Sequence, residues 1–293
     1  MYFVQGLALI TMQKKIILNS PRLLELKKHK RKIFLSKFCF VLIGLIIIFV
    51  GLGFLSRINR LNITNINING NKIVEVEEIK EKVDQNLLGY YLWLFPKTNI
   101  FFYPKSKIIQ SLSTEIKRLK DINLTINDSG TLEVLVKERT GLYTWCGVIF
   151  EPVSDKSSMC YFLDEDGFMF DEAPYFSGEV YFKFYGETVD SYFAKNNFTK
   201  LVLFKEILQQ MGLKPVMLYK MGNSDVKILL SATKFSTTNP EIIFKTDADL
   251  DIMAENLDAA LDTEPLKTDF PKKYSSLLYI DLRYGNKVVY KFK

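Results

Sequence analysis

The hydrophobic pattern begins with one uninterrupted apolar run. The eighteen residues 38–55, FCFVLIGLIIIFVGLGFL, contain no charged side chain. Because an α-helix rises about 1.5 Å per residue, the run covers roughly 27 Å, close to the ~30 Å hydrocarbon core of a bilayer. It predicts one transmembrane helix, with most of the chain on one side of the membrane.

Residues 61–139 show strand and helix periodicities in the order β-α-α-β-β. Helical spacing predicts one helix over 76–87 and a second after Pro104, whose missing N–H costs nothing in a first helical turn. Alternation predicts strands at 61–68, 122–126 and 132–136. Since each helix has one apolar stripe and the sheet one apolar face, we expect two helices on one face of a small sheet.

Residues 140–293 are dominated by short strands. The predicted strands are 142–150, 160–163, 168–170, 180–184, 226–230, 242–245, 277–284 and 287–292, and the predicted helices are 198–211 and 250–261. Gly285-Asn286 is a strong hairpin signal between the last two strands. The expected fold class is α+β: a tail (1–37), a transmembrane helix (38–55), a β-α-α-β-β domain (61–139) and a mostly antiparallel β domain with two helices (140–293).

Charge predicts the orientation of this anchor. Nine Lys or Arg and one Glu give the tail a net charge of +8, and only Arg57 and Arg60 immediately follow the span. A basic flank is typically cytoplasmic, so we expect residues 56–293 outside the plasma membrane. The alternative of a cleaved signal peptide fits a 37-residue leader poorly. The sequence leaves open whether the chain starts at Met1 or Met12.

The basic excess belongs to the tail. Subtracting the tail from the 39 basic and 33 acidic residues of the chain leaves 30 and 32, a net charge of about −2. A basic arm can bind nucleic acid, but beside a membrane span it is more typical of orientation and of contact with anionic lipids. We therefore expect the membrane, and not nucleic acid, as the partner of the tail.

The cysteines predict one covalent link. Cys146 and Cys160 flank the polar segment 151–158 on the side of the membrane where disulfides form. A cross-strand disulfide is the favoured interpretation, and two free buried thiols are the alternative. The third cysteine, Cys39, lies in the span.

The sequence offers little for catalysis. Its one histidine, His29, lies in the tail, which argues against external histidine triads and most zinc sites. The acids at 164–167 fit a hairpin turn better than a Ca²⁺ loop, and those at 247–251 fit a helix N-terminus. We expect no enzymatic activity, no catalytic or metal residue, no cofactor and no small-molecule substrate.

The order of these elements resembles the FtsQ/DivIB family of bacterial cell-division proteins. The segment NININGNKIVEVEEIKEKV (65–83) is similar to the opening of that family's POTRA domain, and LEVLVKER (132–139), followed by Trp145, resembles its end. YFLDEDGFMF (161–170) and YIDLRYGNKVVYK (279–291) resemble the early hairpin and the last strands of the family's β domain. The aromatic segment LLGYYLWLFPKTNIFFY and the cysteine pair depart from the family pattern.

The resemblance implies a membrane-bound scaffold of the divisome, located at the division septum, that helps control septal peptidoglycan synthesis. Its partners would be FtsB/DivIC-like and FtsL-like proteins, together with other divisome proteins. The family's docking region, where a partner strand joins a sheet edge, maps to Tyr284, Lys287, Val288, Val289, Tyr290 and Lys291.

Alternatives remain at this point. The lysines of the final strand could instead guard the edge against pairing, a common use of edge lysine. The chain could also be a membrane-anchored cell-envelope enzyme, or a POTRA-bearing component of a secretion or transport system.

Overall fold

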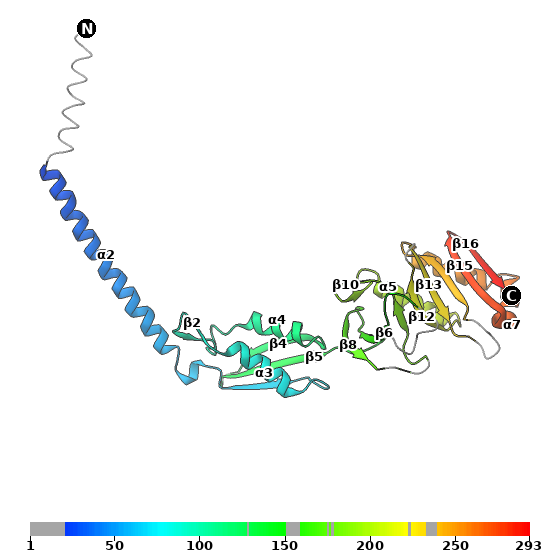
Figure 1. Ribbon diagram of the computed structural model, residues 1–293, viewed down its shortest axis with the longest axis horizontal. Helices are drawn as coiled ribbons and strands as arrows, with labels where there is room; N and C mark the ends of the chain where they lie inside the picture. Colours follow the sequence, from blue (N-terminus) through cyan, green and yellow to red (C-terminus); the bar gives the residue numbers. More distant parts are fainter. Residues whose placement is uncertain are drawn as a thin grey trace, which may run out of the picture. The chain divides into compact units, whose positions relative to one another are not determined.

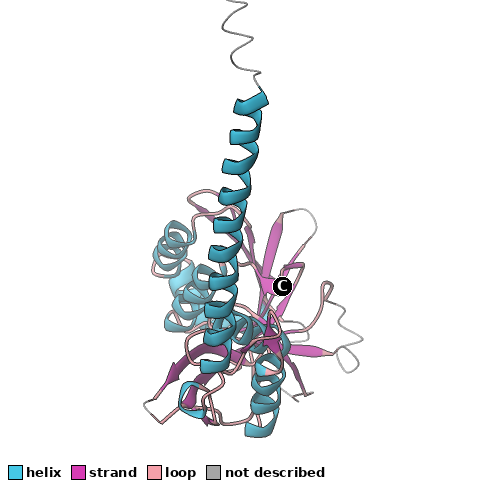
Figure 2. Cartoon of the chain, turned by 90° about the vertical axis from the view of Figure 1, so that its left-hand side faces the viewer, coloured by secondary structure: helices cyan, strands magenta, loops and turns pink. Residues whose placement is uncertain are grey.

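The computed structural model describes residues 21–127, 129–150, 159–174, 176, 179–221, 224–232 and 239–293, with the side chains from residue 25 onward (Figure 1). The polar segment 151–158, residue 128 between two predicted strands and the first 20 residues of the basic tail lie outside these ranges. Helices and strands are mixed along the chain (Figure 2), so the α+β class is confirmed.

The long helix α2 runs from Pro21 to Leu55 and ends at the last residue of the apolar run. Within the described ranges, the part from Glu25 to Leu55 is the one helical stretch long and apolar enough to cross a membrane. Its large apolar side chains are exposed along most of its length. This confirms the predicted apolar helix, whereas its orientation stays a prediction.

The described residues divide into two compact units. Within the described ranges, the first comprises residues 21–69, 77–108 and 124–134, and the second comprises residues 70–76, 109–123 and 135–293. The predicted boundary between residues 139 and 140 is a different division, and it stays a prediction.

The predicted β-α-α-β-β order is present after α2, with a short hairpin inserted between the two helices. The elements are β1 (Asn65–Asn69), α3 (Val76–Leu87), β2 (Tyr90–Tyr91), β3 (Phe95–Pro96), α4 (Lys105–Glu115), β4 (Leu119–Ile126) and β5 (Thr131–Glu138). As far as the structure describes the chain, β1, β5 and β4 form a sheet in that order, and β2 and β3 form a small hairpin. Helix α3 buries one stripe, Ile79, Val83 and Leu87, as its spacing predicts.

The second sheet contains strands from residue 143 to the C-terminus. Its strands are β6 (Tyr143–Trp145), β7 (Cys160–Leu163), β8 (Met169–Ala173), β9 (Lys183–Tyr185), β12 (Pro215–Lys220), β13 (Asp225–Leu230), β14 (Glu241–Lys245), β15 (Leu277–Tyr284) and β16 (Lys287–Phe292). Within the described ranges their order is β16-β15-β14-β13-β12-β9-β6-β7-β8. Most neighbours are antiparallel, as predicted, but β9 pairs in parallel with β6 and β12, and β14 with β15.

Helical crossovers explain two of the parallel pairs. Between β9 and β12 the chain forms a small β10–β11 hairpin (Thr188–Val189 and Tyr192–Phe193) and helix α5 (Phe198–Gln210), and between β14 and β15 it forms α6 (Leu250–Leu261) and α7 (Leu266–Lys273). Parallel neighbours need such long connections. Phe204 of α5 and Leu257 of α6 join Ile228, Ile242 and Ile280 of the sheet in one buried apolar cluster, so the helices cover one sheet face.

Candidate docking edge

The final strand lies at one end of the large sheet. Strand β16 pairs with β15 in antiparallel fashion, and no other described strand pairs with it. Figure 1 shows β16 (red) as the outermost strand beside β15. An edge strand presents backbone N–H and C=O groups that a further strand can bind. This is the position that the predicted docking residues require.

The side chains of β16 alternate between two environments, because successive residues of a strand point to opposite faces. Val288, Tyr290 and Phe292 are half-buried and pack against the apolar cluster, with the Tyr290 and Phe292 rings 5.6 Å apart. Lys287, Val289 and Lys291 are exposed on the other face. The inner face therefore holds the strand on the domain, and the outer face is open to solvent.

The backbone groups of β16 alternate in the same way. The N–H of Lys293 donates to the carbonyl of Ser276 at 2.8 Å, so it points toward the β15 side. Successive residues direct their N–H and C=O groups to opposite sides of a strand. The groups of Lys287, Val289 and Lys291 thus point toward β15. Those of Val288, Tyr290 and Phe292 point toward the free edge.

The register of the pair keeps this alternation intact. Ile280 lies opposite Tyr290 and Asp281 opposite Val289, and the register shifts fall on β15 rather than on β16. Strand β16 is therefore regular over its whole length. A partner strand could use the outward donors and acceptors of three residues, including Phe292, which the family resemblance did not include.

Tyr284 occupies the end of β15 at the hairpin and lies opposite Lys287. Its side chain is 58% exposed, whereas Val289 is 40% exposed. Gly285 forms the turn with a φ of 66°, a left-handed conformation that suits glycine. The hairpin thus gathers all six predicted docking residues on one corner of the sheet, together with an exposed aromatic side chain.

A charged network stabilises the sheet next to this edge. The Arg283 guanidinium donates to Asp281 of the same strand at 2.6 Å and to Asp225 of β13 at 2.7 Å. The Lys245 ammonium lies 2.6 Å from Asp225. Arg283 therefore pairs with one carboxylate of its own strand and with another on a neighbouring strand.

The network changes the ionisation of both carboxyl groups, which are almost completely buried. The hydrogen bond from Lys245, aided by Arg283, lowers the pKa of Asp225 despite desolvation. Desolvation raises the pKa of Asp281, but the Arg283 bonds outweigh it, so that pKa is also lowered. Both groups are therefore held as carboxylates, and their role is structural.

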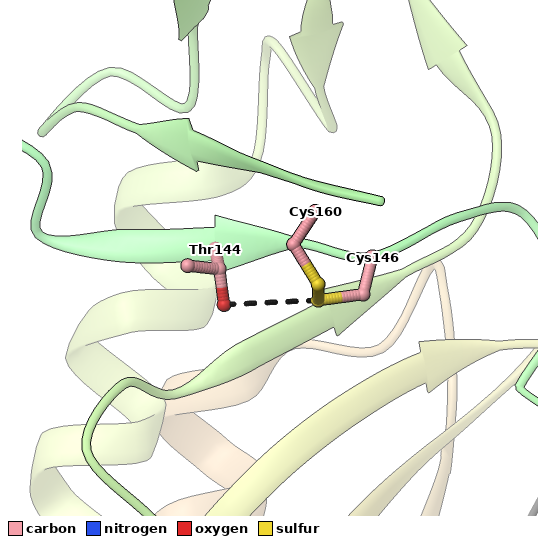
Figure 3. The surroundings of a disulfide bond; sticks show 3 residues. All are labelled: Thr144, Cys146 and Cys160. Carbon is pink, nitrogen blue, oxygen red and sulfur yellow. Dashed lines mark hydrogen bonds between the residues drawn. A yellow bond between two sulfur atoms is a disulfide. The ribbon is translucent and has the colours of Figure 1, made fainter. Parts of the chain in front are cut away.

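The cysteine pair lies toward the other end of the sheet. Cys146 and Cys160 form a disulfide with their Cα atoms 4.1 Å apart, and Thr144 Oγ1 lies 3.9 Å from the Cys146 sulfur (Figure 3). Cys146 is buried, and Cys160 begins β7, which pairs with β6. The bond ties the segment after β6 to the start of β7.

The acidic clusters have structural partners. Asp164 is buried and accepts the N–H groups of Asp166 and Phe168, both at 2.9 Å, as well as a hydrogen bond from Arg139. Asp249 accepts the N–H groups at the start of α6 and caps that helix. Both interpretations from sequence, a turn and a helix N-terminus, are confirmed. Among the described residues no cluster of three or more His, Cys, Asp or Glu is arranged for a metal ion.

Comparisons with known proteins do not assign the chain to a class. No protein-family model matches the sequence, and no curated protein matches it.

Proposed function

We propose that the chain is a membrane-anchored, non-enzymatic scaffold that binds another polypeptide by adding its strand to β16. The observation that carries this proposal is the position of β16 at the edge of the large sheet. Main-chain hydrogen bonds would supply affinity, and the side chains beside the edge would supply specificity. Helix α2 would hold the scaffold at the membrane.

The resemblance to the FtsQ/DivIB family suggests which partners to test. Under this proposal the incoming strand belongs to an FtsB/DivIC-like protein in complex with an FtsL-like protein. The scaffold would then work on the outer side of the plasma membrane at the division septum, where it would help control peptidoglycan synthesis. The basic tail would lie in the cytoplasm.

The chemistry around β16 fits strand addition. The outward backbone groups of the strand lie between a half-buried apolar face and an exposed face that carries two lysines. The lysines would disfavour edge pairing between two copies of this chain, since like charges repel across a strand pair. A partner strand with acidic side chains opposite Lys287 and Lys291 would remove that repulsion.

The test compares two substitutions at Val288 in the full chain. Val288→Pro removes one outward N–H, whereas Val288→Ala keeps it and serves as the matched control. Each variant is co-expressed with the tagged FtsB/DivIC-like and FtsL-like proteins of its own organism, and the complex is recovered from detergent extracts. We expect Val288→Ala to be recovered with the partners and Val288→Pro to be lost. Equal recovery of the two variants would show that the lysine-flanked edge is guarded rather than used.

A photo-crosslinking residue provides a second readout. Introduced at Val289, on the outer face of β16, it should form a crosslink to the partner, because a strand added to the edge lies beside that side chain. The control position is Leu203 of α5, which is 52% exposed and lies on a helix. Crosslinks from Leu203 and none from Val289 would place the partner elsewhere.

A further inference from the structure

The aromatic segment between α3 and α4 packs on the end of the long apolar helix. The Phe95 ring contacts the Phe49 ring of α2 edge to face, with centroids 5.2 Å apart. Leu94 approaches so closely that a Cβ atom added at Gly53 would lie 3.1 Å from Leu94 Cβ. Both contacts belong to the first compact unit.

Polar contacts fix the same segment to the end of α2. The Arg57 guanidinium donates to the carbonyl oxygens of Trp93 and Leu94, each at 3.4 Å. The buried side chain of Asn99 donates to the carbonyl of Ser56 at 3.1 Å. The segment is therefore held at the end of the helix by backbone carbonyls as well as by side-chain packing.

These contacts set the depth of the segment in a membrane. Phe49 lies six residues before Leu55, the last residue of α2, which corresponds to about 9 Å along the helix. If the apolar run fills the hydrocarbon core, Phe95 lies about 9 Å inside the edge of that core, among the acyl chains. The hairpin formed by β2 and β3, which includes Phe95, then reaches from the boundary between lipid and water into the acyl chains; Figure 1 shows it beside the end of α2.

The outer surface of the segment is unusually apolar and exposed. Trp93 is 91% exposed and Leu92 73%, and large exposed side chains are also found at Tyr90, Phe101 and Phe102. Leu92 and Trp93 have φ angles of 48° and 60°, a conformation that costs energy for residues with side chains. The backbone is thus strained at the tip of the segment. The hydrogen bonds from Arg57 to the carbonyls of Trp93 and Leu94 hold it in this conformation.

We propose that this aromatic segment is a second membrane anchor, which inserts into the phospholipid interface beside α2. Tryptophan and tyrosine favour this zone because their rings combine an apolar body with a polar edge. Arg57 and Arg60, at the end of the helix, lie where they can bind lipid phosphates. The inference rests on the proposed membrane span, but not on the proposed partner of β16.

The test uses Trp93 as its own reporter. The chain contains two tryptophans, so Trp145→Phe leaves Trp93 as the single emitter. The full-length variant is reconstituted into phosphatidylcholine–phosphatidylglycerol vesicles, with and without brominated acyl chains. We expect brominated lipid to quench most of the Trp93 emission and aqueous iodide to quench little of it.

Two controls separate insertion from other effects. Trp93→Phe leaves Trp145, whose indole N–H donates to the Gly186 carbonyl at 2.9 Å, and brominated lipid should not quench it. Val189→Trp, in a background lacking both natural tryptophans, places the indole at an exposed position of the second unit, where iodide should quench it.

Two results would overturn the inference. The first leaves the membrane span intact, and the second excludes it as well. If the chain floats with the vesicles while iodide quenches Trp93 and brominated lipid does not, the segment faces water and is left for a protein partner. If the chain does not float with the vesicles at all, the membrane span itself is wrong.

Discussion

Tyr290 lies directly opposite Ile280 in the antiparallel pair of β15 and β16, and both side chains pack on the apolar cluster beneath the sheet. Because the neighbouring residue Val289 directs its N–H toward β15, the N–H of Tyr290 points away from it. This relationship separates the residues that hold the strand in place from those that can bind a partner.

Proline substitutions should therefore affect stability differently at adjacent positions. Val289→Pro removes a donor to β15 and should lower the free energy of unfolding by about 1 to 3 kcal/mol. Val288→Pro removes an outward donor, which edge strands tolerate, and should cost less. Urea denaturation of both variants checks this order. A larger loss of unfolding free energy for Val288→Pro would mean that the N–H of Val288, and not that of Val289, points toward β15.

The charged network predicts a pH dependence. Because the folded pKa values of Asp225 and Asp281 are lowered, their contribution is complete above the pKa of an unfolded Asp, about 3.9, and is lost as the pH falls through the folded values. Arg283→Met should lower the melting temperature at neutral pH. The difference in melting temperature between this variant and the unsubstituted chain should become smaller in acid, and thermal melts from neutral to acidic pH measure it.

The control for that series is Lys273→Met. It removes an exposed pair with Asp269 on α7, a kind of interaction that contributes little to stability. Its melting temperature should stay close to that of the unsubstituted chain at each pH. If the Arg283→Met difference were instead constant from neutral to acid conditions, the two carboxylates would not be the groups that Arg283 stabilises.

The disulfide should contribute measurably to stability. The bridge spans a sequence separation of 14, and closing a loop of about 15 residues is worth about 3 kcal/mol in the chain-entropy model. Replacing both Cys146 and Cys160 by Ala should lower the free energy of unfolding by roughly that amount. The oxidised chain should lose stability when a reductant is added, whereas the double variant should be insensitive to it. If the reductant lowered the stability of both proteins equally, the disulfide would not be the cause of the loss.

Sequence periodicity predicted the elements whose local signals agree with their packing. The bounds of α6, β7, β15 and β16 match the predicted residues, because apolar spacing, a helix cap or a Gly-Asn turn marks them. The predicted strand at 142–150 was too long. Strand β6 ends at Trp145, and Gly147 then adopts a φ of 118°, which an extended strand does not allow.

Other elements gave no local signal. Strand β12 begins at Pro215, and proline is accepted at the first residue of a strand but does not signal one. Helix α7 contains Pro271, which argues against a helix. In both cases pairing or packing with distant residues outweighs local preference, so a single sequence does not reveal them. The strand order is equally non-local, so the edge position of β16 needed the structure.

The aromatic segment shows the same limit. The sequence shows that the segment is long and rich in aromatic residues. It does not show whether those side chains are buried in the core or exposed on the surface. The contacts of Phe95 with Phe49 and of Leu94 with Gly53, together with the hydrogen bonds from Arg57, place the segment beside the long helix. Its candidate role as a membrane contact could not be derived from composition alone.

Hydrogen exchange at the final strand tests the central claim most directly. The full chain is compared alone and in complex with the FtsB/DivIC-like and FtsL-like proteins, and exchange is resolved at single amides of β16. We predict that the N–H groups of Val288, Tyr290 and Phe292 become protected in the complex, while those of Val289 and Lys291 are already protected in the free chain. A stable complex in which the three outward amides exchange as fast as before would contradict strand addition at this edge.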